Sequence, residues 1–305
     1  MYSFKKILIT GGNGFIAKNL LEGLGDEYNI FAPNSKELNL LDPNKTFNYI
    51  KKHQFNTIIH TATYDAAPTF STKNPNKVLE NNLKMFFNIT RCEEYFGKMI
   101  YFGSGAEFGR ENWGPQMNEN YIDKNIPLEW PYGFSKYIMT KYALAKDNIY
   151  NLRLFSVFGK YNDWRYRFIS NACCKAVLGL PITIKQNTFF DHLYIDDLTK
   201  IVKWFIENKP RNSILEPYGH QVYNVCSGTL YQHKDLANII KKISNKNLDI
   251  IIQNEDLNIK CGGDNSLLLS EMNNFKFNPI EDSIKKLYNW YELNKNTIDI
   301  NKMCY

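Results

Sequence analysis

Cysteine is scarce in this chain and is not arranged for metal binding or for disulfides. The 305 residues include six cysteines, none of them in a C-x-x-C arrangement. Adjacent Cys173 and Cys174 are poorly placed to bond to each other, because a disulfide needs a specific separation of the two backbones. This pattern predicts a reducing compartment, no zinc site and no other metal.

Long apolar runs and blocks of like charge are also absent. No apolar segment reaches the ~20 residues of a membrane-spanning helix, and Met1–Lys6 leads into a strand-like run without room for a signal peptide. The net charge of +6 and the pI near 8.8 come from lysines scattered over the sequence. We therefore expect a cytoplasmic protein with no membrane or nucleic-acid partner, whose surface favours an anionic small molecule.

A glycine-rich turn follows the first apolar run, in the segment Ile7–Ala17. A strand that turns abruptly into a helix needs a residue that tolerates positive φ, which Gly11 supplies, and Gly14 leaves space for a close approach of the backbone to phosphates. The following helix presents free N–H groups and the positive end of its dipole. The turn therefore predicts a dinucleotide site.

Short apolar runs alternate with helical patterns along the first half of the chain. The 44% of apolar residues is enough for a large core, either in one α/β unit or in two lobes. Strands spaced by crossover helices predict an α/β fold with a doubly wound parallel sheet. The predicted strands are 6–9, 30–32, 57–62, 99–102, 152–155 and 182–185, and the predicted helices are 15–24, 44–53, 76–96, 132–147, 166–179 and 280–293.

These patterns predict two domains. Residues 1–159 form a dinucleotide-binding Rossmann domain, to which segments near 188–206 and 221–232 return, and residues 160–305 mainly form a smaller C-terminal lobe for the substrate. Such a lobe covers the carboxyl edge of the sheet, where folds of this class bind ligands.

A tyrosine and a lysine one helical turn apart, Tyr132 and Lys136, predict acid–base chemistry. A free phenol titrates near pH ~10, and we expect the ammonium and an oxidised nicotinamide to lower the pKa of Tyr132. Small neighbours at the start of its helix favour Tyr132, whereas Tyr137 and Tyr142 fall among apolar residues. The Tyr-x-x-x-Lys spacing occurs at five places: Tyr2/Lys6, Tyr132/Lys136, Tyr137/Lys141, Tyr142/Lys146 and Tyr291/Lys295.

With these residues, the chain resembles the extended short-chain dehydrogenase/reductases that act on nucleotide sugars, including those like GDP-L-fucose synthase. Seven segments resemble the motifs of that family in order and spacing: Thr10–Ala17, Ile59–Thr63, Asn82 with Asn88, Tyr101–Gly109, Tyr132 with Lys136, Arg153–Gly159 and Phe190–Asp197. The resemblance implies hydride transfer between a nicotinamide and a sugar carbon. Tyr132 would exchange the hydroxyl proton, Ser104 would share the hydrogen bond to the reacting oxygen, and Lys136 would hold the nicotinamide ribose.

The absence of certain catalytic residues of the family limits the reactions that the resemblance implies. The dehydratases of the family carry an Asp-Glu pair where this chain has Gly105 and Ala106. The epimerase-reductases carry a cysteine at the position of Ala106 and a histidine where we align Arg167. The resemblance therefore implies reduction without C3/C5 epimerisation, or a simple 4-epimerisation.

The second predicted strand ends without a carboxylate that would bind an adenosine ribose. Asn34, Ser35 and Lys36 are available for a 2′-phosphate, which favours NADP(H) over NAD(H). The expected cofactor-binding residues are Gly11, Asn13, Gly14, Phe15, Ile16, Asn34, Ser35, Lys36, Leu41, Asp42, Thr61, Ala62, Thr63 and Phe155.

The substrate side departs from the family pattern. Phe190 and Asn265 stand where the family has arginines, and Ser156 replaces an asparagine; these positions commonly hold the nucleotide diphosphate. The residues that we expect to contact the substrate are Glu107, Lys160, Arg165, Arg167, Lys185 and Asn265.

The sequence therefore predicts a homodimeric, NADPH-dependent reductase of a GDP- or CDP-linked 4-keto sugar, which supplies a deoxy or heptose sugar for a surface polysaccharide. The dimer would pair the helices predicted at 76–96 and 132–147. Two alternatives stay open. One is an NAD-dependent 4-epimerase, and the other is a catalytically silent nucleotide-binding regulator on the same fold.

Overall fold

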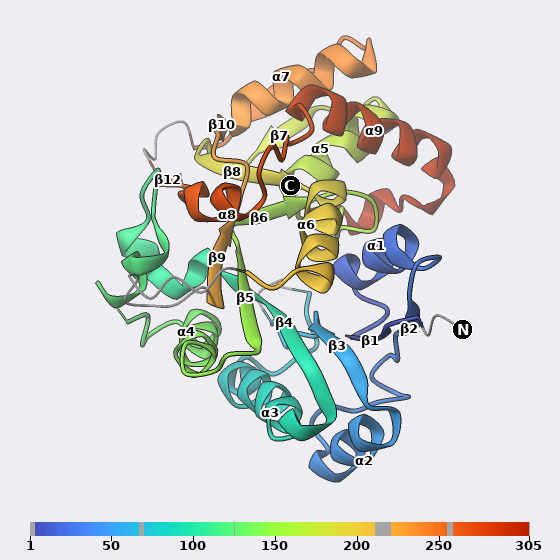
Figure 1. Cartoon of the computed structure of the whole chain (residues 1–305). Coiled ribbons are helices and arrows are strands. Elements are labelled where there is room, and N and C mark those ends of the chain that lie inside the picture. The colour runs from blue at the N-terminus through green and yellow to red at the C-terminus, as the bar shows by residue number, and fades with distance from the viewer. Residues whose placement is uncertain (1–3, 67–69, 125, 211–220, 255–258, 305) are drawn as a thin grey trace.

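The computed structural model describes residues 4–66, 70–124, 126–210, 221–254 and 259–304. A six-stranded sheet in the order β2-β1-β3-β4-β5-β9 forms its centre (Figure 1). All of its neighbouring strands are parallel, and the chain order runs in opposite directions from β1. Its strands are β1 (Lys6–Thr10), β2 (Asn29–Phe31), β3 (Phe55–His60), β4 (Phe96–Ser104), β5 (Ile149–Leu154) and β9 (Val222–Val225).

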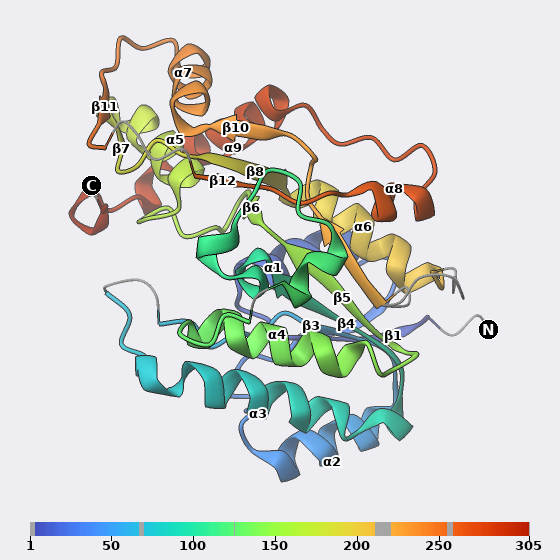
Figure 2. The ribbon, with the colours of Figure 1, turned by 90° about the vertical axis from the view of Figure 1, so that its left-hand side faces the viewer.

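Helices cover both faces of this sheet, as the doubly wound fold requires (Figure 2). Successive side chains of β1 point to opposite faces: Ile7 and Ile9 enter the core below α1 and α6, and Leu8 enters the core on the other side. The predicted α/β fold is confirmed. One face carries α1 (Phe15–Leu24) and α6 (Ile195–Glu207), and the other carries α2 (Pro43–His53), α3 (Val78–Thr90) and α4 (Pro131–Ala143).

The C-terminal half builds a lobe around a smaller sheet. β8 (Phe189–Tyr194) pairs with β6 (Ser156–Phe158) and β12 (Lys260–Cys261) in parallel and with β10 (Leu230–Gln232) in antiparallel fashion. β7 (Ile182–Ile184) and β11 (Ile250–Ile252) form a separate parallel pair. The helices of the lobe are α5 (Phe168–Leu178), α7 (His233–Ser244), α8 (Ser266–Glu271) and α9 (Ile280–Leu293).

The segments predicted to return to the Rossmann domain divide between the two parts. Helix α6 packs on α1, and β9 is an edge strand of the large sheet. β8 and β10 pair with each other in the small sheet instead, because β8 offers both of its edges to strands of the lobe. Within the ranges described, no helix is long and apolar enough to cross a bilayer.

The helix predicted at 76–96 is wrong at its C-terminal end. Helix α3 stops at Thr90, a short 3₁₀ turn spans Glu93–Tyr95, and β4 already begins at Phe96. Phe96 pairs with Phe55 of β3, so the pairing of the strands extends to residues that the local pattern assigned to the helix.

Candidate active site

The turn after β1 has the conformation that its glycines predict. Gly11 has φ of +68°, in the left-handed region, and the N–H of Gly14 donates to the carbonyl of Gly11 at 2.8 Å. No side chain caps α1, and its first turn has no acidic residue. The first N–H groups and the positive dipole end of α1 are therefore available to a pyrophosphate, so this turn fits a dinucleotide.

The loop after β2 lies against this turn. A Cβ on Gly12 would lie 2.0 Å from the carbonyl oxygen of Ala32, so only glycine permits this contact. The Asn34 side chain accepts a hydrogen bond from the N–H of Lys36 at 2.9 Å, which shapes the loop, and Ser35 and Lys36 are exposed. Farther on, Leu41 packs on the core, and the Asp42 carboxylate caps α2.

The loop after β3 is held in place from both sides. The Thr61 hydroxyl donates to the carbonyl of Thr10 at 2.6 Å, and the N–H of Ala62 donates to the Thr10 hydroxyl at 3.2 Å. From α3, the Asn82 side chain accepts from the N–H of Tyr64 at 2.8 Å and contacts the hydroxyl of Thr63. This bracing places Thr61, Ala62 and Thr63 beside the glycine turn, where a dinucleotide would extend.

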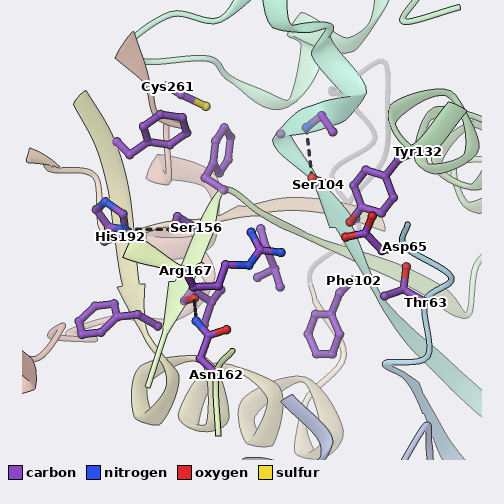
Figure 3. Close-up of a pocket in the computed structure, with 18 of the residues that line it drawn as sticks. Thr63, Asp65, Phe102, Ser104, Tyr132, Ser156, Asn162, Arg167, His192 and Cys261 are labelled. Atoms are coloured by element: carbon purple, nitrogen blue, oxygen red, sulfur yellow. Dashed lines mark hydrogen bonds between the residues drawn. The ribbon is translucent and has the colours of Figure 1, made fainter. Parts of the chain in front are cut away.

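A pocket of about 530 Å³ connects this edge of the sheet with the C-terminal lobe (Figure 3). It brings the predicted catalytic residues together with several predicted cofactor residues that are distant in the sequence. The pocket is lined by Ser104, Tyr132 and Lys136 and by Phe15, Ile16, Thr61, Thr63 and Phe155, all of them predicted.

The two side chains of the Tyr-Lys pair occupy one wall of the pocket. Lys136 is buried below the Tyr132 ring, with its Nζ 5.8 Å from the ring centroid, and it donates to the carbonyl of Phe102 at 2.8 Å. The Ser104 hydroxyl oxygen accepts from the N–H of Ala106 at 3.2 Å, and the hydroxyl also forms a hydrogen bond with the Tyr132 phenol. The two hydroxyl groups therefore face the same part of the pocket.

The competing Tyr-Lys pairs of α4 lie outside this pocket. Lys141 forms an ion pair with Asp123, and Lys146 forms one with Glu93 at 2.9 Å. Neither tyrosine of these pairs lines the pocket. Lys146 lies beyond the end of α4 at Ala143, so this helix holds only the first two pairs complete. The structure therefore favours Tyr132 over Tyr137 and Tyr142.

The prediction that the pKa of Tyr132 is lowered is wrong as far as the protein's own groups are concerned, because together they raise it. Burial, followed by the negative charge of Asp65, raises the pKa of Tyr132 to about 12, against the opposing effects of Ser104 and Arg167. Burial lowers the pKa of Lys136 to about 8. At neutral pH the phenol is therefore protonated, which suits it to donate a proton.

Glu107 does not contact the pocket, so its predicted role as a substrate ligand is wrong. Its carboxylate is fully buried and accepts from the N–H of Ser104 at 2.8 Å, the hydroxyl of Thr140 at 2.9 Å and the Nε of Arg153 at 2.8 Å. Because all three partners are groups of the protein itself, this carboxylate holds buried elements together and does not bind a ligand.

Four other predicted substrate residues also lie outside the lining of the described pocket. Lys160 pairs with Glu22, and Arg165 pairs with Asp163. Lys185 is exposed at the end of β7, and the Asn265 amide donates to the carbonyl of Cys226 at 2.9 Å. Of the predicted set, Arg167 is the residue that lines the pocket.

The structure adds pocket residues for which the sequence held no local signal. Asp65 follows the loop after β3, Arg110 and Trp113 follow β4, and Trp130 precedes α4. His233, at the start of α7, also lines the pocket. Each of these residues stands alone in its segment, so only the tertiary fold brings them to one place.

Comparison with known proteins identifies the family. Residues 7–226 match the NAD dependent epimerase/dehydratase family. The chain belongs to this family. Its members are extended short-chain dehydrogenase/reductases that modify nucleotide sugars, in agreement with the resemblance seen in the sequence.

Single proteins resemble this chain only over a short segment or at low sequence identity. GDP-L-colitose synthase of Yersinia pseudotuberculosis is 32% identical over 109 residues, a match that spans about a third of each chain, 35% of both. A GDP-D-glycero-L-gluco-heptose synthase of Campylobacter jejuni, solved in the presence of NADPH, has a TM-score of 0.85 over 96% of this chain and 99% of that one. A GDP-mannoheptose C4 reductase of the same organism with NADP bound has a TM-score of 0.82 over the same shares. Both structures are 17% identical to this chain, so they show the fold.

Proposed function

We propose that this protein is an NADPH-dependent reductase of the C4 keto group of a GDP- or CDP-linked sugar, and that it acts without epimerisation at C3 or C5. The observation that carries the proposal is the pocket wall formed by Ser104, Tyr132 and Lys136 next to the glycine turn. The NADP of the similar C4 reductase supports the choice of cofactor. A product of this kind would be a deoxy or heptose sugar for a surface polysaccharide, and homodimer formation stays a prediction.

Each of the three residues Ser104, Tyr132 and Lys136 has a separate role in the proposed reduction. Bound at the glycine turn, NADPH supplies the hydride. The protonated Tyr132 phenol donates a proton to the carbonyl oxygen that becomes a hydroxyl, and the Ser104 hydroxyl donates a hydrogen bond to the same oxygen. The Lys136 ammonium lies beneath the phenol and stabilises the phenolate that the proton transfer leaves.

The surroundings of this wall supply few groups for proton exchange on carbon. Ala106 has a methyl group where the epimerase-reductases have a thiol, and the Glu107 carboxylate is sealed in the interior. Asp65 is the carboxylate that lines the described pocket, close enough to Tyr132 to raise its pKa. A second activity at C3 or C5 would therefore depend on Asp65 or on an imidazole of the pocket, His192 or His233.

A spectrophotometric assay of NADPH oxidation with GDP- and CDP-linked 4-keto-6-deoxyhexoses tests the proposal. We expect turnover by the wild type and a loss of about 10²- to 10⁴-fold in kcat for Tyr132→Phe, which removes the proton donor and keeps the ring. The affinity for NADPH should stay within a few-fold. Tyr137→Phe, on the same helix outside the pocket, is the matched control and should keep full activity.

Activity in Tyr132→Phe together with loss in Tyr137→Phe would contradict the assignment of the catalytic pair. Absence of turnover with every keto sugar would favour the silent regulator. NAD retained by the purified protein, with interconversion of the two C4 epimers, would favour the 4-epimerase.

A further inference from the structure

Phe190 and Asn265, at the two positions where the resemblance to the family implies diphosphate-binding arginines, are unsuited to that task. Phe190 lines the pocket as part of an aromatic wall, with its ring centroid 5.6 Å from that of Trp113 and 5.9 Å from that of His233. Asn265 is neutral, and its amide is engaged by a backbone carbonyl. The two negative charges of a nucleotide diphosphate would therefore need cations elsewhere in the pocket.

Three cationic side chains line the described pocket: Arg110, Lys136 and Arg167. Lys136 is buried against the carbonyl of Phe102 and belongs to the catalytic wall. Arg110 and Arg167 are exposed, and among the described residues neither has an ion-pair partner. Nearby Arg165, by contrast, has its charge matched by Asp163.

Aromatic rings hold both exposed guanidinium groups in place. The Arg110 guanidinium lies 4.3 Å from the Trp130 ring, and that of Arg167 lies 4.9 Å from the Tyr166 ring. Stacking on an aromatic face leaves the in-plane N–H groups of arginine free to donate. The Arg167 guanidinium also forms a hydrogen bond with the Tyr166 hydroxyl. Its remaining donors and those of Arg110 can still bind phosphate oxygens.

The two arginines approach the catalytic tyrosine from different parts of the fold. Arg110 follows the short helix after Ser104, and its stacking partner Trp130 lies 6.2 Å from the Tyr132 ring. Arg167 is the N-cap of α5 in the lobe, and its charge acts on the Tyr132 phenol. In Figure 3 its side chain extends into the space between the wall with Ser156 and His192 and the wall with Ser104 and Tyr132.

We propose that Arg110 and Arg167 together bind the diphosphate of the nucleotide sugar and replace the family arginines lost at Phe190 and Asn265. The inference rests on the proposed function, because a sugar whose C4 lies at Tyr132 has its diphosphate one ring farther along the pocket. Since the two arginines come from different domains, a bound diphosphate connects the Rossmann domain with the lobe.

We call Arg110 and Arg167 together the diphosphate clamp. Isothermal titration with GDP-mannose and CDP-glucose, in the presence of NADP⁺, tests the clamp without requiring turnover. The wild type should bind one of these probes. We expect Arg110→Gln and Arg167→Gln each to weaken that binding about tenfold or more, since each removes charge-assisted hydrogen bonds. Arg165→Gln, two residues from Arg167 and outside the pocket, is the matched control and should bind within twofold of the wild type.

The affinity for NADP⁺ and the turnover of the wild type distinguish failure of the clamp from failure of the proposed function. The affinity for NADP⁺ should be unchanged in all variants, because the glycine turn binds its pyrophosphate. If the wild type binds a probe and both pocket variants bind it equally well, or if Arg165→Gln is as weak as they are, the clamp is wrong while the proposed function stands. If the wild type binds neither probe and reduces no keto sugar, the proposed function fails and the clamp with it.

Discussion

Glu107 is the side chain that connects the catalytic elements. Its carboxylate binds the backbone of Ser104 at the end of β4, the hydroxyl of Thr140 on α4 and the Nε of Arg153 on β5. Helix α4 carries Tyr132 and Lys136, so this one buried group positions Ser104 relative to the catalytic pair. The ion pair with Arg153 is fully shielded from solvent on both sides.

Replacement of this carboxylate by an amide should be costly. Glu107→Gln leaves the buried Arg153 guanidinium without its ion-pair partner, and breaking a buried pair on one side costs about 3–5 kcal/mol of unfolding free energy. Urea unfolding measures this loss. The double variant Glu107→Gln/Arg153→Met should recover part of it, because it removes both charges. A loss below about 1 kcal/mol in the single variant would show that the network contributes little.

The sequence could identify the catalytic residues better than the substrate residues. The spacing of Tyr132 and Lys136 occurs at five places in the chain, but the small residues beside Tyr132 at the start of its helix distinguish this pair. The turn at Gly11 carries a conformational requirement. Glu107 has no such signature: a carboxylate next to a catalytic segment can face a ligand or an internal guanidinium. Only the pairing of β4 with β5, which brings Arg153 beside it, decides between these two.

At the scale of the elements, the sequence predicted the strands and helices of the first half and few of the second. Helix α7 had a usable signal, because Leu236, Ala237 and Ile240 lie buried on one face. Strands β6 and β12 span three and two residues, which is too short for an alternating pattern to show. Their strand character comes from pairing with β8, a contact between segments distant in the sequence.

The loop after β2 should determine the choice of cofactor. Lys36 is exposed on a turn shaped by Asn34, close to the glycine turn, and we expect it to contact the 2′-phosphate of NADPH. We expect a higher kcat/KM with NADPH than with NADH, and Lys36→Ala should reduce this preference about 5- to 30-fold through loss of a charge-assisted contact. Lys52→Ala, on the exposed side of α2, is the control. Equal use of both cofactors by the wild type would contradict this role.

Considering the molecule as a whole, the pocket draws its lining from both of its sheets. The part built on the large sheet supplies Ser104, Tyr132, Lys136, Asp65 and Arg110, and the part around the small sheet supplies Arg167 and the aromatic wall around Phe190. Arg110 gave no signal in the sequence because its role depends on Trp130 and on the position of the lobe. The local chemistry was therefore predictable, whereas the assembly of the substrate site required the fold.

In the proposed reaction the pocket reduces a carbonyl and exchanges no proton on carbon, and the isotope content of the product distinguishes these two events. A 4-keto nucleotide sugar would be reduced in D₂O with unlabelled NADPH, and the product would be examined by NMR and mass spectrometry. The hydride comes from the cofactor, and the Tyr132 proton goes to oxygen, from which it exchanges with solvent.

We expect one NADPH oxidised per product and no carbon-bound deuterium beyond that which the substrate takes up without enzyme. Enzyme-dependent deuterium at C3 or C5 would contradict a reduction without epimerisation. It would show that another group of the pocket, such as Asp65 or His192, moves a proton on carbon although position 106 has no thiol.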